Sequence, residues 1–217
     1  MLSGYSEPKK WNKLAVAPIW LKDKFLMLIN REAENARQGK KGRIVAKMNS
    51  LCDPVIMHAL YDASAAGVKI DLIVRGICCI KAGVPGLSEN INVRSIVGNY
   101  LEHSRIFYFY NDGFEDIYMG SADWMPRNLD KRVEITFPVE DPKLKAQIKD
   151  ILKIQLADTL KAHIMQPDGS YAKQDLRGKA KLDSQMYFVE KAHEGHESVK
   201  NAENSRVFIP VESREEE

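Results

Sequence analysis

The sequence is poor in cysteine, with three in 217 residues. Cys52, Cys78 and Cys79 are an odd number without CxxC spacing, a pattern that argues against a disulfide framework and against a zinc site. The five histidines likewise lack the spacing of metal ligands. We therefore expect no metal bound by this chain and a cytoplasmic location, with peripheral association with a membrane left open.

The sequence also lacks a long apolar run. No stretch approaches the roughly 18 apolar residues of a membrane-spanning helix, and the mean hydropathy is -0.36. The opening stretch MLSGYSEPKKWNK contains no apolar segment of the kind found in secretory signals. With 44% hydrophobic and 29% charged residues, the composition instead predicts a well-buried core and excludes extended disorder.

Neither sign of charge dominates, since the formal net charge is +2. The charge is unevenly distributed: residues 168–217 carry 8 Lys/Arg against 11 Asp/Glu, which leaves 24 against 19 in residues 1–167. A modestly basic body suits an anionic ligand, whereas proteins that bind DNA are usually far more basic. Charge alone places small or linear phosphates slightly above other ligands, and it does not favour DNA.

Apolar residues follow the periods of strands and helices in alternation. Residues 43–48 and 68–74 predict two buried strands, and the helix between them begins at Pro54 with Asp53 as its N-cap. A strand, a helix and a strand within about thirty residues form a βαβ unit with parallel strands. The other expected elements are strands at 13–17, 91–97, 104–110, 115–119 and 131–139 and helices at 21–37 and from Pro142 to about 163. The fold class that follows is α/β, a mixed sheet flanked by helices.

The pattern divides the chain into a body, residues 1–167, and a C-terminal arm, residues 168–217. The arm shows only two apolar patches, at 186–189 and 207–211, and we expect it to be ordered in part at most. Within the body, residues 75–90 contain three glycines and a proline and follow a buried strand. Because ligands bind at this carboxyl edge in α/β sheets, the loop predicts the position of the site.

Two segments carry the residues most suited to chemistry on phosphate. His103 and Arg105 stand two positions apart at the entry to a strand, so both side chains lie on one face. A histidine can move a proton near neutral pH, and an arginine presents a planar fork to phosphate oxygens. The returning segment Gly120-Ser121 adds backbone and hydroxyl donors where glycine permits a close approach. Each motif is weak by itself, since a single histidine at a strand entry is more commonly structural, but together they predict a clamp for phosphoryl oxygens.

Arginines add positive charge around the same loops. Arg75 lies at the carboxyl end of a buried strand and Arg132 near the start of a later one, where ligand contact is as well supported as solvation. Arg127 follows the Gly-Ser segment, and Arg94 is expected to be a solvated surface residue. Trp124, within the Gly-Ser loop, predicts a hydrophobic anchor for that loop.

Four stretches together resemble the C-terminal catalytic region of the long-chain bacterial polyphosphate kinases: RGICC (75–79), GVPGLSEN (83–90), LEHSR (101–105) and SADWMPRN (121–128). The resemblance covers most of residues 1–167. It implies a phospholipase D-like domain, the second of two similar α/β halves that face each other across an active site.

The resemblance also implies an activity, the reversible transfer of the terminal phosphate of ATP to polyphosphate through a phosphorylated histidine in the first half. His103 would be the second, assisting histidine, and Arg75 and His103 would contact the phosphates of the nucleotide. Arg132, with Arg127, would line the path of the polyphosphate. The implied partners are ATP, ADP, polyphosphate, the upstream domains of the same enzyme and further copies of it, and the implied cofactor is Mg²⁺, bound mainly by the upstream half and by ATP.

The sequence departs from the family in lacking those upstream domains, including the phosphorylated histidine. Since phosphoryl transfer needs donor, acceptor and charge-stabilising groups in line, we expect this chain alone to be nearly inactive. Two other hypotheses stay open. One is a phospholipase D-like phosphodiesterase or nuclease that dimerises to pair two histidines, although HxR replaces the usual HxK and Asp123 stands where Asn is usual. The other is a non-catalytic module that binds polyanions.

Overall fold

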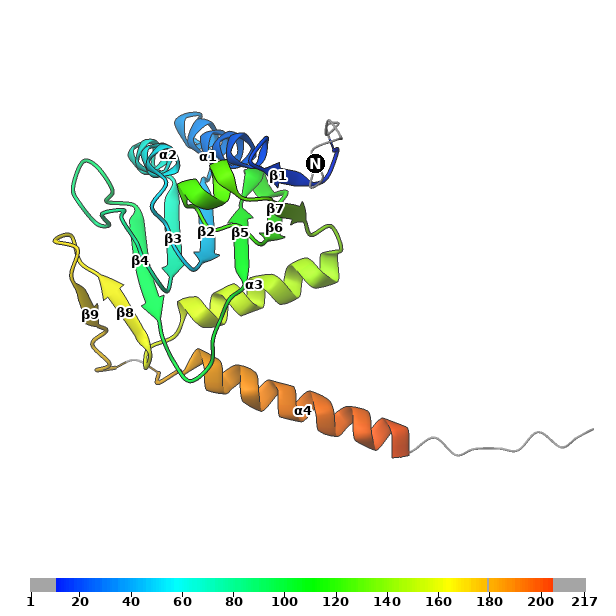
Figure 1. Ribbon diagram of the computed structural model, residues 1–217. Coiled ribbons are helices and arrows are strands. Elements are labelled where there is room, and N and C mark those ends of the chain that lie inside the picture. Colours follow the sequence, from blue (N-terminus) through cyan, green and yellow to red (C-terminus); the bar gives the residue numbers. More distant parts are fainter. Residues whose placement is uncertain (1–10, 179, 205–217) are drawn as a thin grey trace, which may run out of the picture.

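The centre of the protein is a nine-stranded mixed sheet with helices on both faces (Figure 1). This computed structural model describes residues 11–178 and 180–204. The strands are β1 (Ala15–Ala17), β2 (Arg43–Met48), β3 (Lys69–Val74), β4 (Ile91–Ile96), β5 (Arg105–Phe109), β6 (Asp116–Gly120), β7 (Glu134–Pro138), β8 (Ala162–Met165) and β9 (Tyr171–Lys173). The helices are α1 (Leu21–Arg37), α2 (Pro54–Ala65), α3 (Pro142–Leu156) and α4 (Ser184–Asn204), with two short helical turns, η1 (Asn111–Gly113) and η2 (Arg127–Lys131).

The strand order is β1-β7-β6-β5-β2-β3-β4-β8-β9. The neighbours β2, β3 and β4 are parallel, whereas β5 pairs with β2, and β6 with β5, in the antiparallel sense. The predicted βαβ unit and the mixed α/β sheet are therefore confirmed.

Side chains alternate between two apolar layers. In β2, Ile44 and Met48 face the layer beneath α1 and α2, while Val45 faces the layer beneath α3, in line with the two-residue period of a strand. Trp124 is fully buried in the first layer, with its ring centroid 5.5 Å from that of Phe25. The expectation that Trp124 anchors its loop is confirmed.

Two helices begin with the same Asp-Pro signal. Asp53 accepts hydrogen bonds from the N–H groups of Val55 and Ile56 at the start of α2, both at 3.0 Å. Asp141 does the same for Lys143 and Leu144 at the start of α3, at 2.7 and 3.1 Å. Proline at the first position needs no N–H partner, so both starts are fixed locally by the sequence.

The two caps offer a matched test of stability. Replacing the exposed Asp141 with alanine is expected to lower the free energy of unfolding by about 1 kcal/mol. Asp53 is buried and its Oδ2 lies 2.9 Å from Nζ of Lys22, so Asp53→Ala is expected to cost about 2 kcal/mol. Urea unfolding measures both values, and equal losses would show that the Lys22 contact contributes nothing.

The helix predicted to reach about residue 163 is too long, because α3 ends at Leu156. Asp158 terminates it: its Oδ1 accepts from the N–H groups of Lys161 and Ala162 at 2.8 and 3.0 Å. The chain then enters β8, which pairs with β4. The expectation for Arg94 is also wrong, since its half-buried guanidinium donates to the carbonyl of Leu156 at the end of α3.

The segment after residue 167 contains more structure than its sequence pattern indicates. β9 pairs with β8 across the boundary placed at residue 167, and α4 covers the first apolar patch, 186–189. The second patch, 207–211, lies outside the described residues. In Figure 1, α4 extends away from the sheet beyond its first turns. Within the described part of the chain, no helix is long and apolar enough to cross a membrane.

Candidate active site

Residues predicted for the site lie at one edge of the sheet. The carboxyl ends of β2 and β3 meet there with the start of β5, because β2 is parallel to β3 and antiparallel to β5. Arg75 follows β3 and His103 precedes β5. Ser121 follows β6, whose last residue, Gly120, pairs with Arg105. The structure thus brings these side chains to the edge at which the sequence places the site.

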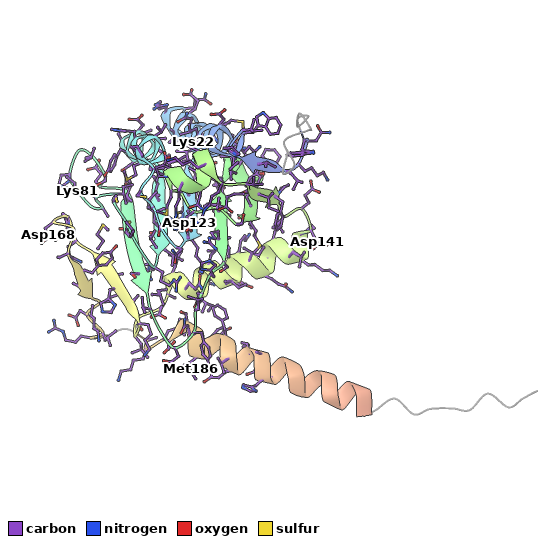
Figure 2. The ribbon with its side chains drawn as sticks, viewed as in Figure 1. Lys22, Lys81, Asp123, Asp141, Asp168 and Met186 are labelled. Atoms are coloured by element: carbon purple, nitrogen blue, oxygen red, sulfur yellow. The ribbon has the colours of Figure 1, made fainter. Side chains whose placement is uncertain are left out.

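A buried carboxylate, Asp123, joins the loops of this edge. Asp123 is 2% exposed and lies in the interior of the body in Figure 2. Its Oδ1 accepts from Arg105 Nε at 3.0 Å and from the backbone N–H of Asn49 at 2.8 Å, and its Oδ2 accepts from Arg105 Nη2 at 3.2 Å. Asn49 Oδ1 in turn accepts from Arg75 Nη2. Arg105 Nη1 donates to the backbone oxygen of His103 at 2.8 Å, so one chain of hydrogen bonds connects Arg75 with the backbone of His103.

These hydrogen bonds use every donor nitrogen of the Arg105 guanidinium. All three of its nitrogens donate to Asp123 or to the backbone of His103, and the ion pair is largely buried. Arg105 therefore fixes the backbone directly before β5. Its direct contact with phosphate stays a prediction.

Ser121 also has partners within the protein. Its hydroxyl donates to Glu134 Oε2 and accepts from the backbone N–H of Ile135 at 3.2 Å. Glu134 Oε1 accepts from Asn128 Nδ2 at 2.6 Å, which ties the Gly-Ser segment to η2. Gly120 is needed beside it, because a Cβ there would lie 2.4 Å from the backbone oxygen of Ile135. A phosphate contact of Ser121 stays a prediction as well.

Arg75 has one donor that no described residue accepts from. It is half-buried, and its Nε is buried without a hydrogen-bond partner among the described residues. A cavity of about 10 Å³ lies beside it, lined in part by Lys47 and Glu102. A buried donor without an acceptor is unfavourable, so Arg75 has hydrogen-bonding capacity that the described residues do not use. Its contact with a phosphate oxygen stays a prediction.

His103 itself is exposed, and its ring forms no hydrogen bond with any residue that the structure describes. The residues on either side of it are held by Lys47, which is 4% exposed. Lys47 Nζ donates to Ser104 Oγ at 2.8 Å and lies 3.4 Å from Glu102 Oε2. Burial lowers the pKa of Lys47, and the neighbouring Glu102 opposes that change. The imidazole is thus free to meet a ligand while its backbone is fixed.

Arg127 and Arg132 are exposed on the turn η2 and directly after it. The backbone N–H of Arg132 donates to the oxygen of Arg127 at 3.0 Å. Over residues 11–178 and 180–204, neither guanidinium forms an ion pair. Both are available to an anion, and their role on a polyphosphate path stays a prediction.

The sequence did not predict the roles of four residues at this edge. They are Lys47, Asn49 and Glu102, and also Asp123, whose buried pairing with Arg105 was not expected. One signal was present, since a lysine inside the apolar strand RIVAKM is unusual unless it is paired. The other residues are recognised only through partners that lie far away in the sequence. No three His, Cys, Asp or Glu side chains in the described part of the chain are arranged to hold a metal ion.

Comparison with known proteins shows which fold and which family this chain has. The phospholipase D family member Nuc from Salmonella typhimurium superposes with a TM-score of 0.50 at 16% identity, over 75% of this chain and 97% of that one. The fold is therefore phospholipase D-like, as expected. A family model described as polyphosphate kinase C-terminal domain 2 matches residues 14–185, and the chain belongs to that family.

Two relatives show how much of such proteins the chain represents. It is 58% identical over 170 residues to a polyphosphate kinase of Synechocystis sp., covering 78% of this chain and 23% of that protein. The crystal structure of polyphosphate kinase from Porphyromonas gingivalis superposes with a TM-score of 0.85 at 41% identity, over 91% of this chain and 30% of that one. The chain thus spans less than a third of each of these two relatives.

Proposed function

We propose that this chain forms the second half of the active site of an ATP–polyphosphate phosphotransferase. The observation that carries the proposal is the linked pair of Arg75 and His103 at one sheet edge: one presents an unsatisfied buried donor and the other an exposed imidazole. The names of the relatives supply the substrate class. ATP, ADP and polyphosphate are the substrates that we propose, and the remaining domains of the enzyme and further copies of it are the proposed protein partners.

In the proposed transfer, a nitrogen of a histidine in the upstream half bonds to the terminal phosphorus of ATP. The bond from that phosphorus to the bridging oxygen of ADP breaks. A terminal oxygen of polyphosphate then bonds to the same phosphorus, and the phosphorus–nitrogen bond breaks to release the histidine. Negative charge grows on the phosphate oxygens during each step. We assign to His103 a hydrogen bond or proton for those oxygens and to Arg75 a fixed positive charge beside them. Arg127 and Arg132 would contact the polyphosphate.

In this proposal Mg²⁺ is not bound by the residues of this chain. The carboxylates of the edge are already engaged: Asp123 with Arg105, Glu102 with Lys47, and Glu134 with Ser121 and Asn128. The described residues therefore do not fit a magnesium site of their own, and Mg²⁺ would be bound by ATP and the upstream half.

The test is transfer of labelled phosphate from ATP to polyphosphate. We expect none from this chain alone and measurable transfer when it is mixed with the remainder of the Synechocystis relative. Polyphosphate made by the chain alone would contradict the assignment of the phosphorylated histidine to the upstream half. No transfer from a mixture that is shown to associate would instead support a module that only binds polyanions, and hydrolysis of a bis-aryl phosphate would support the phosphodiesterase.

A further inference from the structure

The segment that carries His103 has little apolar support. It connects β4 with β5, residues 97–104, and has no regular secondary structure. Val97, Tyr100 and Leu101 are 62%, 54% and 72% exposed. With so few buried side chains, the position of this segment depends on its polar contacts.

Gln185, in the first turn of α4, supplies the most distant of these contacts in sequence. It is buried, and its amide pairs with both backbone groups of Tyr100: Oε1 accepts from the N–H at 3.0 Å and Nε2 donates to the carbonyl at 2.8 Å. Nε2 also donates to Glu102 Oε1 at 3.1 Å. The Gln185 amide thus bonds the backbone of Tyr100 as a neighbouring strand would. The same amide also holds Glu102, the residue that precedes His103.

The other oxygen of Glu102 completes the arrangement. Oε2 accepts from Gln155 Nε2 near the end of α3 and lies 3.4 Å from Lys47 Nζ. Lys47 reaches past His103 to Ser104. The residues on both sides of His103 are therefore fastened, and only its own side chain is left exposed.

The position of Gln185 is itself fixed. Ser184, which precedes it, donates from its N–H and its hydroxyl to Asp158 Oδ2 at 2.8 and 2.7 Å. Gly98 lies so close that a Cβ would stand 2.3 Å from Gln185 Oε1. Figure 1 shows the segment between β4 and β5 reaching the start of α4.

We infer that Gln185 is a positioning residue for His103, so that the first turn of α4 sets where the imidazole stands. The inference rests on the proposed function in taking His103 as the assisting group. A displacement of a reacting group by about 1 Å can lower a rate by about 100-fold. Loss of the Gln185 amide is therefore expected to act on turnover rather than on the binding of ATP.

The first test needs no activity. Amide hydrogen exchange is measured on this chain and on Gln185→Met, which keeps the length of the side chain but removes its polar atoms. We expect exchange of the Tyr100 amide, which donates to Gln185 Oε1, to become at least about 10-fold faster, while β2 and β3 are unchanged. Met186→Gln, an exposed change on the same turn, is the control and should leave the segment as it is. Unchanged exchange of the Tyr100 amide for Gln185→Met would overturn the inference.

The second test uses the enzyme reconstituted with the remainder of the Synechocystis relative. Gln185→Met is expected to lower kcat by about 10- to 100-fold with KM for ATP nearly unchanged. In a His103→Ala background the same change should have almost no further effect, because the group that it positions is gone. An equal loss in both backgrounds would show a merely structural role and overturn the inference. If the mixture without substitutions is shown to associate but transfers nothing, the proposed function fails, and hydrogen exchange still decides whether Gln185 holds the segment.

Discussion

Replacing His103 with alanine is expected to lower phosphate transfer by about 10²- to 10⁴-fold in the reconstituted enzyme, the range typical for loss of an acid/base group. The reason is local: the imidazole is exposed at the sheet edge, with its backbone held by Arg105 and its neighbours by Lys47. Removing a side chain that has no hydrogen bond within the described protein should leave the stability of the chain nearly unchanged. The loss would therefore report on chemistry rather than on folding.

The matched control is His58→Ala. His58 is an exposed histidine on α2, so its removal changes the histidine count without touching the site. Transfer rates of the two variants and of the unaltered chain are compared at saturating ATP and polyphosphate, with urea unfolding as a check on stability. A His103→Ala rate within a few-fold of the unaltered rate would remove His103 from the mechanism.

Replacing Asp123 with alanine is expected to lower the free energy of unfolding by about 3–5 kcal/mol. Its removal leaves the guanidinium of Arg105 largely buried without a counter-charge, which is the costly way to break a buried ion pair. The backbone N–H of Asn49 loses its acceptor at the same time. The measurement is urea unfolding followed by circular dichroism.

Glu140→Ala is the control for Asp123→Ala, because Glu140 forms an ion pair with Lys13 in which both side chains are mostly exposed. Exposed pairs contribute at most about 1 kcal/mol, so the two carboxylates should differ by several-fold in effect. Comparable losses would show that the Asp123–Arg105 pair is not the joint that we describe. Asp123→Ala should also loosen Arg75 and His103 together, since both are connected through it.

The parts of the fold that the sequence predicted are those set by local signals. The Asp-Pro starts of α2 and α3 are read from adjacent residues, and the parallel strands follow from apolar periods. The end of α3 was missed because it depends on a tertiary contact: Asp158 is shared between the turn into β8 and Ser184 at the start of α4. The sequence indicated α4 only as an apolar patch, because Ser184 and Gln185 anchor its first turn through partners that lie far away in the sequence.

The site divides in the same way. Arg75 and His103 were predicted because Arg75 follows one recognisable strand and His103 precedes another. The order and direction of these strands bring the two residues to one edge. Asp123 and Lys47 act through partners that are 74 and 57 residues away, at Asn49 and Ser104. No spacing in the sequence encodes such pairs. The hydrogen bond from the Ser121 hydroxyl to Glu134, on the next strand, is likewise not encoded by any spacing in the sequence.

The position of β2 between β3 and β5 has a consequence for how the site is assembled during folding. Pairing β2 with β3 closes a short connection through α2, whereas pairing β2 with β5 joins Lys47 to the neighbourhood of Ile106 across a much longer one. Because the entropy lost on loop closure grows with loop length, we expect β2, α2 and β3 to form an early unit and β5 to add to it afterwards. Arg75 belongs to that early unit and His103 to the strand that arrives later. A partly folded chain would present the arginine without the histidine, so the two side chains would come to one edge only when β5 pairs with β2.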